Sequence, residues 1–310
     1  MTPTPVYLGL DVAKATLAAH LAGQGFTVPN TAAGHAALCA RIVAHGVPVQ
    51  GICEATGGYE RPLVAALRAA QVPVSVLHPT RARKLADGLG FFAKTDAVDA
   101  AALATIGEKL TPVPTPAPGP GQERLAALVT RREALGELCR REKHHRETTT
   151  DKELLRDIAQ SLAALQKRLE KIGRLITAHF HAVPELGAKA ARLQQAPGVG
   201  PVAAATLLAV LPELGQGHRN RLASLAGLAP RNRDSGATRG PRHIHGGRPK
   251  ARRILYLCAL SAARHHPKLS LFYTRLRTAG KTPKVALIAV ARKLLTHLHA
   301  ALINPNFALA

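Results

Sequence analysis

Two aspartates three residues apart, Asp96 and Asp99, carry the clearest chemical signal in the sequence. They lie in the segment 91–100, Phe-Phe-Ala-Lys-Thr-Asp-Ala-Val-Asp-Ala, where the sequence predicts the first turn of a helix. Residues at this spacing share one helical face, so both carboxylates point the same way. Carboxylates held together raise each other's pKa, and a divalent cation between them relieves the repulsion. The alternative is that both aspartates only cap the helix or interact with its dipole.

Two more carboxylates favour the metal interpretation. Asp11 lies at the end of the apolar run 6–12, and Glu54 directly follows the apolar run 47–53. Short runs of this kind predict buried strands. We therefore expect two strand ends and the start of one helix to bring Asp11, Glu54, Asp96 and Asp99 to one edge of a sheet.

The elements around these residues predict an α/β domain. The predicted strands are 6–12, 16–21, 26–28, 47–53 and 72–77, and the predicted helices are 31–45, 59–70, 79–89 and 96–109. Gly23-Gln24-Gly25 is expected to form the first hairpin turn. A hairpin followed by right-handed crossovers resembles the ribonuclease H-like fold, which includes the RuvC-type resolvases. In such a mixed sheet the first and fourth strands are neighbours.

An uncharged, proline-rich segment, 111–121, predicts the end of this first domain, residues 1–110. We expect it to be an extended polyproline II spacer that spans about 30 Å at ~3 Å per residue. Residues 122–180, within a middle region 122–185, are predicted to be helical throughout. Apolar residues recur there at spacings of three and four: Leu154, Ile158, Leu162, Leu165, Leu169, Ile172 and Ile176. This pattern fits either a helical hairpin packed on itself or a coiled coil that joins two copies of the chain.

The last region, 186–310, is predicted to be mainly helical and opens on Pro-Gly-Val-Gly-Pro. Gly198 and Gly200 directly precede an apolar helix, as in a helix-hairpin-helix motif. A turn of this kind presents backbone N–H groups and a helix N-terminus to a phosphate.

A cationic, glycine-bounded loop, 227–247, contains Ser235 followed by Gly236. Four arginines surround the serine in the sequence: Arg231, Arg233, Arg239 and Arg242. Guanidinium groups bind phosphate oxygens with two hydrogen bonds, so a hydroxyl on this loop is placed to approach a phosphodiester. The alternative is an ordinary Ser-Gly turn on a solvated phosphate-binding face.

The charge of the chain is distributed unevenly. The net charge is +23; residues 1–110 hold 9 Lys and Arg against 7 Asp and Glu, residues 111–185 hold 13 against 10, and residues 186–310 hold 20 against 2. We therefore expect chemistry in the first domain and polyanion binding, to nucleic acid, in the last region. With 3% aromatic residues and no Trp, the main contacts are expected to be to backbone phosphates and not to stacked bases or a membrane surface.

Other site classes find little support. The longest apolar stretch, 202–211, is far shorter than the roughly 20 residues of a membrane span, and no leader is recognised, so we expect a cytoplasmic protein. Cys39, Cys53, Cys139 and Cys258 show no C-x-x-C spacing. Paired histidines occur at 144–145, 243 and 245, 265–266, and 297 and 299, but without cysteine or acidic neighbours we expect them at the surface or facing phosphates.

Together these motifs resemble one family, the DEDD transposases of the IS110 insertion sequences, relatives of the Piv-type DNA invertases. The motifs that carry the resemblance are Gly-Leu-Asp-Val-Ala-Lys at 9–14, Glu-Ala-Thr-Gly-Gly-Tyr at 54–59, Lys-Thr-Asp-Ala-Val-Asp-Ala at 94–100, Pro-Gly-Val-Gly at 197–200, Ala-Gly-Leu-Ala-Pro at 226–230 and Ser-Gly at 235–236. The resemblance covers nearly the whole chain.

The resemblance implies that Asp11, Glu54, Asp96 and Asp99 bind Mg²⁺ and that Ser235 is the nucleophile that joins covalently to DNA. It also implies a noncoding guide RNA encoded by the element, and the long spacer suggests a homo-oligomer whose active site is shared between protomers. Two other functions fit the residues. A RuvC-like junction nuclease would use the same acids with water as the nucleophile. A non-enzymatic DNA-binding protein would use neither the acids nor a nucleophile for catalysis.

Overall fold

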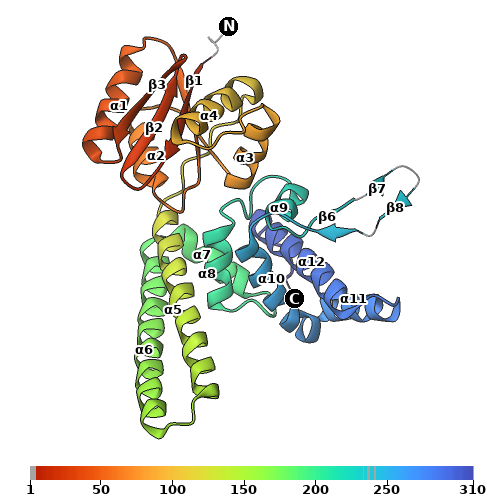
Figure 1. Ribbon diagram of the computed structural model, residues 1–310. Helices are drawn as coiled ribbons and strands as arrows, with labels where there is room; N and C mark the ends of the chain where they lie inside the picture. Colours follow the sequence, from red (N-terminus) through yellow and green to blue (C-terminus); the bar gives the residue numbers. More distant parts are fainter. Residues whose placement is uncertain (1–4, 233, 236–237, 241, 310) are drawn as a thin grey trace. The chain divides into compact units, whose positions relative to one another are not determined.

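A computed structural model describes residues 5–232, 234–235, 238–240 and 242–309. The chain divides into two compact units, residues 1–117 and 118–310. Figure 1 shows the first as a sheet with helices and the second as mostly helical.

The first unit contains a five-stranded mixed sheet in the order β3-β2-β1-β4-β5. Its strands are β1 (Val6–Val12), β2 (Thr16–Leu21), β3 (Gln24–Pro29), β4 (Val49–Glu54) and β5 (Val74–Leu77). β1 is antiparallel to β2 and parallel to β4, with Leu10 opposite Cys53. The expected pairing of the first and fourth strands is thus confirmed, and it puts the ends that carry Asp11 and Glu54 side by side.

The first hairpin turn lies one residue earlier than expected. Ala22 and Gly23 form the turn, both with positive φ (49° and 80°), and Gln24 already belongs to β3. Two positive φ values are the signature of the tight two-residue turn whose twist matches that of the flanking strands. The prediction of Gly23-Gln24-Gly25 was wrong because the hairpin is shorter than glycine spacing suggested.

Four helices complete the first unit: α1 (Ala32–Ala44), α2 (Glu60–Ala69), α3 (Pro79–Gly88) and α4 (Asp96–Leu110). Helix α4 lies directly against β1, and glycines make this approach possible. A Cβ on Gly9 would lie 1.9 Å from the Ala100 carbonyl oxygen, and one on Gly107 would lie 2.6 Å from the Tyr7 ring. Because Gly9 has no side chain, the start of α4 is held close to β1.

The proline-rich segment after α4 is not a free spacer. Thr115 donates its backbone N–H to the Val74 carbonyl oxygen at 2.8 Å and accepts from the Val76 N–H at 2.9 Å. Gln50 and Ser75 both donate to the Pro112 carbonyl oxygen. Residues 112–116 therefore lie along the edge strand β5, and the first unit extends to residue 117, beyond the expected boundary at 110. Prolines suit this position because proline has no backbone N–H, and a residue at the edge of a sheet need not donate a hydrogen bond to a further strand.

The second unit begins with a long helical hairpin. It consists of α5 (Gln122–Thr148) and α6 (Lys152–Ala182), which pack on each other. The two helices are separated at 149–151, as in the helical hairpin that was one of the two interpretations, and Asp151 caps α6 by accepting from the Glu153 and Leu154 N–H groups. Ile158 and Ile176 of the predicted seam are buried, but Leu154 is 58% exposed. A coiled coil between two chains stays a proposal.

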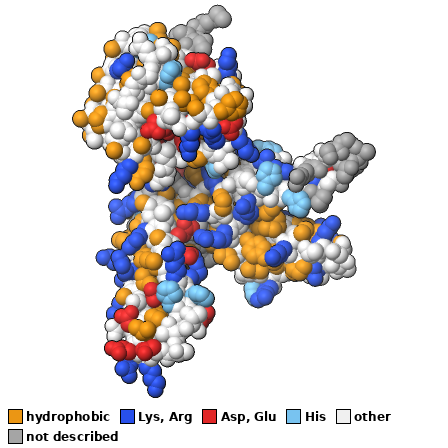
Figure 2. All heavy atoms as spheres, in the orientation of Figure 1, with side chains coloured by type: hydrophobic (Ala, Val, Ile, Leu, Met, Phe, Trp, Pro, Cys, Tyr) orange, Lys and Arg blue, Asp and Glu red, His pale blue; other side chains and the backbone are white. Residues whose placement is uncertain are grey.

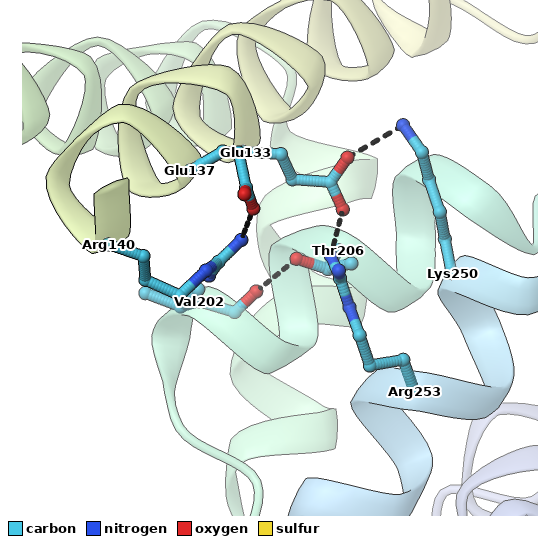
Figure 3. A network of polar contacts seen from close by, with 7 residues as sticks. All are labelled: Glu133, Glu137, Arg140, Val202, Thr206, Lys250 and Arg253. Atoms are coloured by element: carbon cyan, nitrogen blue, oxygen red, sulfur yellow. Dashed lines mark hydrogen bonds and ion pairs between the residues drawn. The ribbon is translucent and has the colours of Figure 1, made fainter. Parts of the chain in front are cut away.

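The remaining helices of the second unit are α7 (Pro184–Gln194), α8 (Pro201–Val210), α9 (Arg219–Leu225), α10 (Pro249–His265), α11 (Pro267–Thr278) and α12 (Pro283–Ile303). The hairpin is fastened to this bundle by Glu133 of α5, which binds Lys250 at 2.6 Å and Arg253 at 3.4 Å on α10 (Figure 3). Helix α12 is long and apolar enough to cross a membrane, but half of its most apolar window is buried in the unit, as in a core helix. The apolar stretch 202–211 was taken as the longest in the sequence because cations interrupt the apolar run of α12.

Candidate active site

A cavity of about 270 Å³ in the first unit gathers three of the four predicted carboxylates. Asp11 comes from β1, Glu54 from the last residue of β4, and Asp99 from the first turn of α4. The fourth, Asp96, is exposed at the start of the same helix. The cap of α4 is Thr95, whose hydroxyl accepts from the Val98 N–H at 3.3 Å, so neither aspartate is the cap.

The electrostatics show that this cavity concentrates negative charge. Burial, then Asp96, Asp99 and Glu54, raise the pKa of Asp11 from 3.8 to about 6. Burial and Asp99 also raise the pKa of Glu54, although Lys94 partly opposes this. Carboxylates with raised pKa values in a cavity are typical of catalytic or cation-binding positions.

A guanidinium group reaches into the same cavity. Arg83 of α3 is held through Nε by Asp87 at 2.9 Å and donates from Nη2 to the Phe92 carbonyl oxygen at 3.2 Å. Its Nη1 lies 3.7 Å from Asp99 Oδ1 and is buried without a hydrogen-bond acceptor among the described residues. Arg83 was not among the predicted site residues; the signal for it in the sequence was Asp87 at i+4 on the same helix.

The carboxylates of the cavity are suitable ligands for a hard cation, but as placed they lie too far apart to bind one together. Carboxylate oxygens are the ligands that Mg²⁺ prefers. Within the part of the chain that the structure describes, no three His, Cys, Asp or Glu side chains are close enough to hold an ion between them. Direct coordination by three carboxylates therefore requires the side chains to move closer.

Two loops that follow the metal-ligand candidates are tied together by Asn30. Its Nδ2 donates to the Ala13 carbonyl oxygen at 2.8 Å and to the Tyr59 carbonyl oxygen at 3.4 Å, and its Oδ1 contacts Nε2 of buried His35 at 2.7 Å. Burial lowers the pKa of His35, which favours a neutral ring. Ala13 comes two residues after Asp11, and Tyr59 five residues after Glu54, so this network links the loops that continue from the two paired strand ends.

Glu60 fixes the second of these loops. It accepts from the Gly58 N–H at 2.8 Å and from the Thr56 N–H and hydroxyl, each at 3.1 Å. Burial would raise the pKa of Glu60, but these hydrogen bonds outweigh it and lower the pKa. Glu60 thus stays ionised and buried as the organiser of the loop after Glu54.

The serine segment in the second unit forms a β ribbon. Strand β6 (Pro230–Arg231) pairs with β9 (His243–Ile244), and β7 (Asp234–Ser235) pairs with β8 (Thr238–Arg239). Ser235 lies opposite Thr238 in the backbone register. Exposed Arg231 and Arg242 lie on the two arms, whereas Arg233 and Gly236 fall outside the described residues. The ribbon thus replaces the expected loop.

The two glycines of the predicted phosphate-binding turn differ in their surroundings. Gly198 has φ +95°, and a Cβ there would lie 2.8 Å from the Cys258 carbonyl oxygen on α10. Gly200 precedes α8, and no atom lies within 4 Å of its added Cβ. A side chain at position 198 would therefore clash with α10, whereas Gly200 is exposed.

Two of the paired histidines are buried, against expectation. His299 is 4% exposed, and its ring nitrogens contact the Gly215 N–H and the Gly217 carbonyl oxygen, both at 3.1 Å. His266 is 1% exposed. Both pack inside the helical bundle. The sequence did not reveal this for His299 because the backbone groups that bind its ring come from residues 215–217, far away in the sequence.

Comparison with known proteins decides the family. Residues 190–274 match the family described as Transposase IS116/IS110/IS902, and residues 8–153 match the DEDD transposase family of IS110. The Pilin gene-inverting protein of Moraxella lacunata is 30% identical over 94% of this chain and 93% of its own length. The chain belongs to the IS116/IS110/IS902 transposase family. The uncharacterized 43.6 kDa protein of insertion element IS110 from Streptomyces coelicolor is 32% identical over 48% of this chain and 38% of its own length.

This membership makes the chain a DNA transposase or recombinase. Its substrate is therefore DNA, and a DEDD domain suggests dependence on a divalent metal. The mixed sheet with carboxylates at the ends of β1 and β4 agrees with the RuvC-like arrangement expected for this family.

Proposed function

We propose that this transposase cuts and rejoins DNA through a phosphoserine intermediate at Ser235, assisted by Mg²⁺ at Asp11, Glu54, Asp96 and Asp99. The observation that carries the proposal is the cavity that three of these acids line, where burial and the neighbouring carboxylates raise the pKa of Asp11 to about 6. A bound divalent cation would polarise a phosphodiester and stabilise a leaving oxygen. It would also remove the repulsion between the acids.

In the proposed reaction the Ser235 hydroxyl attacks phosphorus. A Ser Oγ–P bond forms while one P–O bond to deoxyribose breaks, the hydroxyl proton is lost, and the released sugar oxygen gains a proton. The phosphoserine conserves the energy of the phosphodiester, so a second sugar hydroxyl rejoins the strand without ATP. A serine hydroxyl is a weak nucleophile at neutral pH and therefore needs activation.

Arg83 contributes a phosphate contact in this scheme. Asp87 and Phe92 hold its guanidinium while Nη1 stays free of acceptors beside Asp99. A phosphate oxygen that enters the cavity supplies the missing acceptor. Guanidinium groups are suited to this role because their N–H groups match the spacing of phosphate oxygens.

The partners proposed for this chain follow from charge and family. The cationic region 186–310 binds DNA backbone phosphates through Arg231, Arg233, Arg239 and Arg242 and through the turn at Gly198 and Gly200. A noncoding RNA guides the choice of DNA, and the protein acts in the cytoplasm as a homo-oligomer joined through α5 and α6. The acids and Ser235 act on one phosphate, from one protomer or from two.

The test is a search for a covalent protein–DNA adduct. Purified protein is incubated with Mg²⁺, element-end DNA and RNA transcribed from the element's flanks, then separated by denaturing electrophoresis. We expect an adduct in the wild type that is lost in Ser235→Ala and in Asp96→Asn. Cleaved ends without an adduct, undiminished in Ser235→Ala, would indicate a metal-dependent nuclease and exclude the serine mechanism.

A further inference from the structure

An apolar groove of about 580 Å³ lies in the second unit between the base of the β ribbon and helices α11 and α12. Its apolar lining includes Leu228, Ile244, Phe272, Val285 and Ile288. Val285 is 54% exposed, so the groove keeps apolar surface in contact with water. The volume falls within the roughly 300–1,000 Å³ that small-ligand sites occupy, and exposed apolar surface of this kind marks a binding site.

The groove is also strongly cationic. Lys284, Arg292 and Lys293 of α12 line it, and none has a carboxylate partner among the described residues. Residues 186–310 contain only two acids, and each is bound to an arginine: Glu213 to Arg248, and Asp234 to Arg242. The positive charge of the groove is therefore uncompensated, and its ligand must be an anion with an apolar face.

An unpaired nucleotide has this combination of properties. Its base offers a flat face to apolar and aromatic side chains, and its phosphate attracts Lys and Arg. Phe272 supplies the aromatic surface, with Lys293 Nζ 4.5 Å and Arg275 Cζ 5.3 Å from the ring centroid. A DNA duplex presents phosphates, but its base faces are stacked inside the duplex, so it would leave the apolar lining of the groove exposed to water.

The groove lies next to the segment that carries the proposed nucleophile. Ile244 of β9 and Pro230 of β6 are paired at the base of the ribbon, and both line the groove. The same ribbon continues to β7, where Ser235 lies. Figure 2 shows hydrophobic side chains gathered over the α10 to α12 part of this unit, with Lys and Arg among them.

We infer that this groove holds one unstacked nucleotide of the DNA strand being processed, with its base on Phe272 and its phosphates at Lys284, Arg292 and Lys293. This inference rests on the proposed function for the choice of DNA as the occupant. The groove thereby distinguishes an opened strand from intact duplex. The few aromatic residues of the chain agree with a single stacking position and not with an extended stacking platform.

The test measures binding of fluorescein-labelled single-stranded DNA and of a duplex of the same sequence to the full chain, in EDTA so that no strand is cut. We expect Phe272→Ala to raise the Kd for single strands about tenfold, since one stacked base contributes at this scale, and to change duplex binding less than twofold. Leu271→Ala is the matched control because Leu271 lies on the same helix, is 72% exposed and does not line the groove.

A second variant covers the case in which Phe272→Ala does not fold. Val285→Glu puts a carboxylate at an exposed groove position and should weaken single-strand binding at least as much, with Val285→Gln as its neutral control. The chain has no Trp, so Phe272→Trp adds one fluorophore, which single strands should quench and duplex should not.

Three results would overturn the inference. The first is single-strand binding within twofold of the wild type in both variants, and the second is equal weakening of duplex and single-strand binding. The third, measured in the same assay with single-stranded RNA, is a loss of binding that is confined to RNA. Because binding is measured without metal or Ser235 chemistry, its failure is separate from that of the adduct. If no adduct forms but the groove variants lose only single strands, the nucleotide site stands and the serine mechanism fails.

Discussion

Arg242 donates from Nη1 to both carboxylate oxygens of Asp234, at 2.9 and 2.8 Å. The pair links the two arms of the ribbon next to Ser235, since Asp234 begins β7 and Arg242 directly precedes β9. Asp234 is the nearest acid to the serine in the sequence, but its charge is committed to the arginine. We therefore expect Asp234 to order the ribbon and not to act as the base for the proposed nucleophile.

We expect Asp234→Asn to form the DNA adduct at a rate within about fivefold of the wild type, because a neutral amide still accepts one hydrogen bond from Arg242. Ser235→Ala in the same assay should form none. If Asp234→Asn abolished the adduct while DNA binding stayed normal, Asp234 would be the base after all. The measurement is the initial rate of adduct formation under Mg²⁺.

The burial of Asp11 and the carboxylates around it predict a pH-dependent gain in stability when its charge is removed. Its pKa in the folded chain is about 6, above the 3.8 of a solvent-exposed aspartate, so the folded state binds the proton more tightly than the unfolded state. The cost of the charge is thus absent below pH about 4 and fully present above pH about 6.

Asp11→Asn should therefore stabilise the metal-free protein by about 1–2 kcal/mol at pH 8, less than the full pKa shift implies because the cavity is open to solvent. The gain should vanish near pH 4. Thermal or urea unfolding in EDTA at both pH values measures it, with Lys84→Ala as an exposed control on the neighbouring helix α3. With Mg²⁺ present the order should reverse, since the variant lacks one ligand.

Arg83 offers a way to separate metal binding from phosphate binding. Arg83→Gln removes a cation 3.7 Å from Asp99, so affinity for Mn²⁺, used as a spectroscopic substitute for Mg²⁺, should stay equal or rise. Adduct formation should fall at least tenfold because the phosphate loses its guanidinium contact. Arg81→Gln, an exposed position two residues earlier, should change neither. A parallel loss of Mn²⁺ binding would show that Arg83 only supports the fold.

The sequence was sufficient to predict Asp11 beside Glu54, because its order of strands and helices resembles a ribonuclease H-like sheet, in which the first and fourth strands are neighbours. It did not predict Arg83, because the direction of its guanidinium depends on Asp87 and on the Phe92 backbone beyond its own helix. It also predicted a free spacer at 111–121, because composition describes chain stiffness but not the unpaired donors of an edge strand that bind residues 112–116.

The hydrogen bonds of Asn30 predict that the placement of the proposed ligands Asp11 and Glu54 depends on a residue outside the cavity. Asn30→Ala removes hydrogen bonds to the Ala13 and Tyr59 carbonyl oxygens and leaves His35 without its 2.7 Å partner. We expect a loss of about 1–2 kcal/mol in the free energy of unfolding, as for a partly buried hydrogen-bonded amide. Mn²⁺ affinity should fall several-fold in the folded variant, because Asp11 and Glu54 are no longer held at a fixed spacing.

A matched control is Thr27→Ala on the exposed face of β3, which should leave both stability and Mn²⁺ affinity within error of the wild type. The two readouts distinguish positioning from a general contribution to stability. If Asn30→Ala lowers the unfolding free energy but binds Mn²⁺ as tightly as the wild type below its melting temperature, Asn30 only stabilises the fold. If Mn²⁺ binding weakens in fully folded protein, the link between the two loops is what keeps the acids in register for a shared cation.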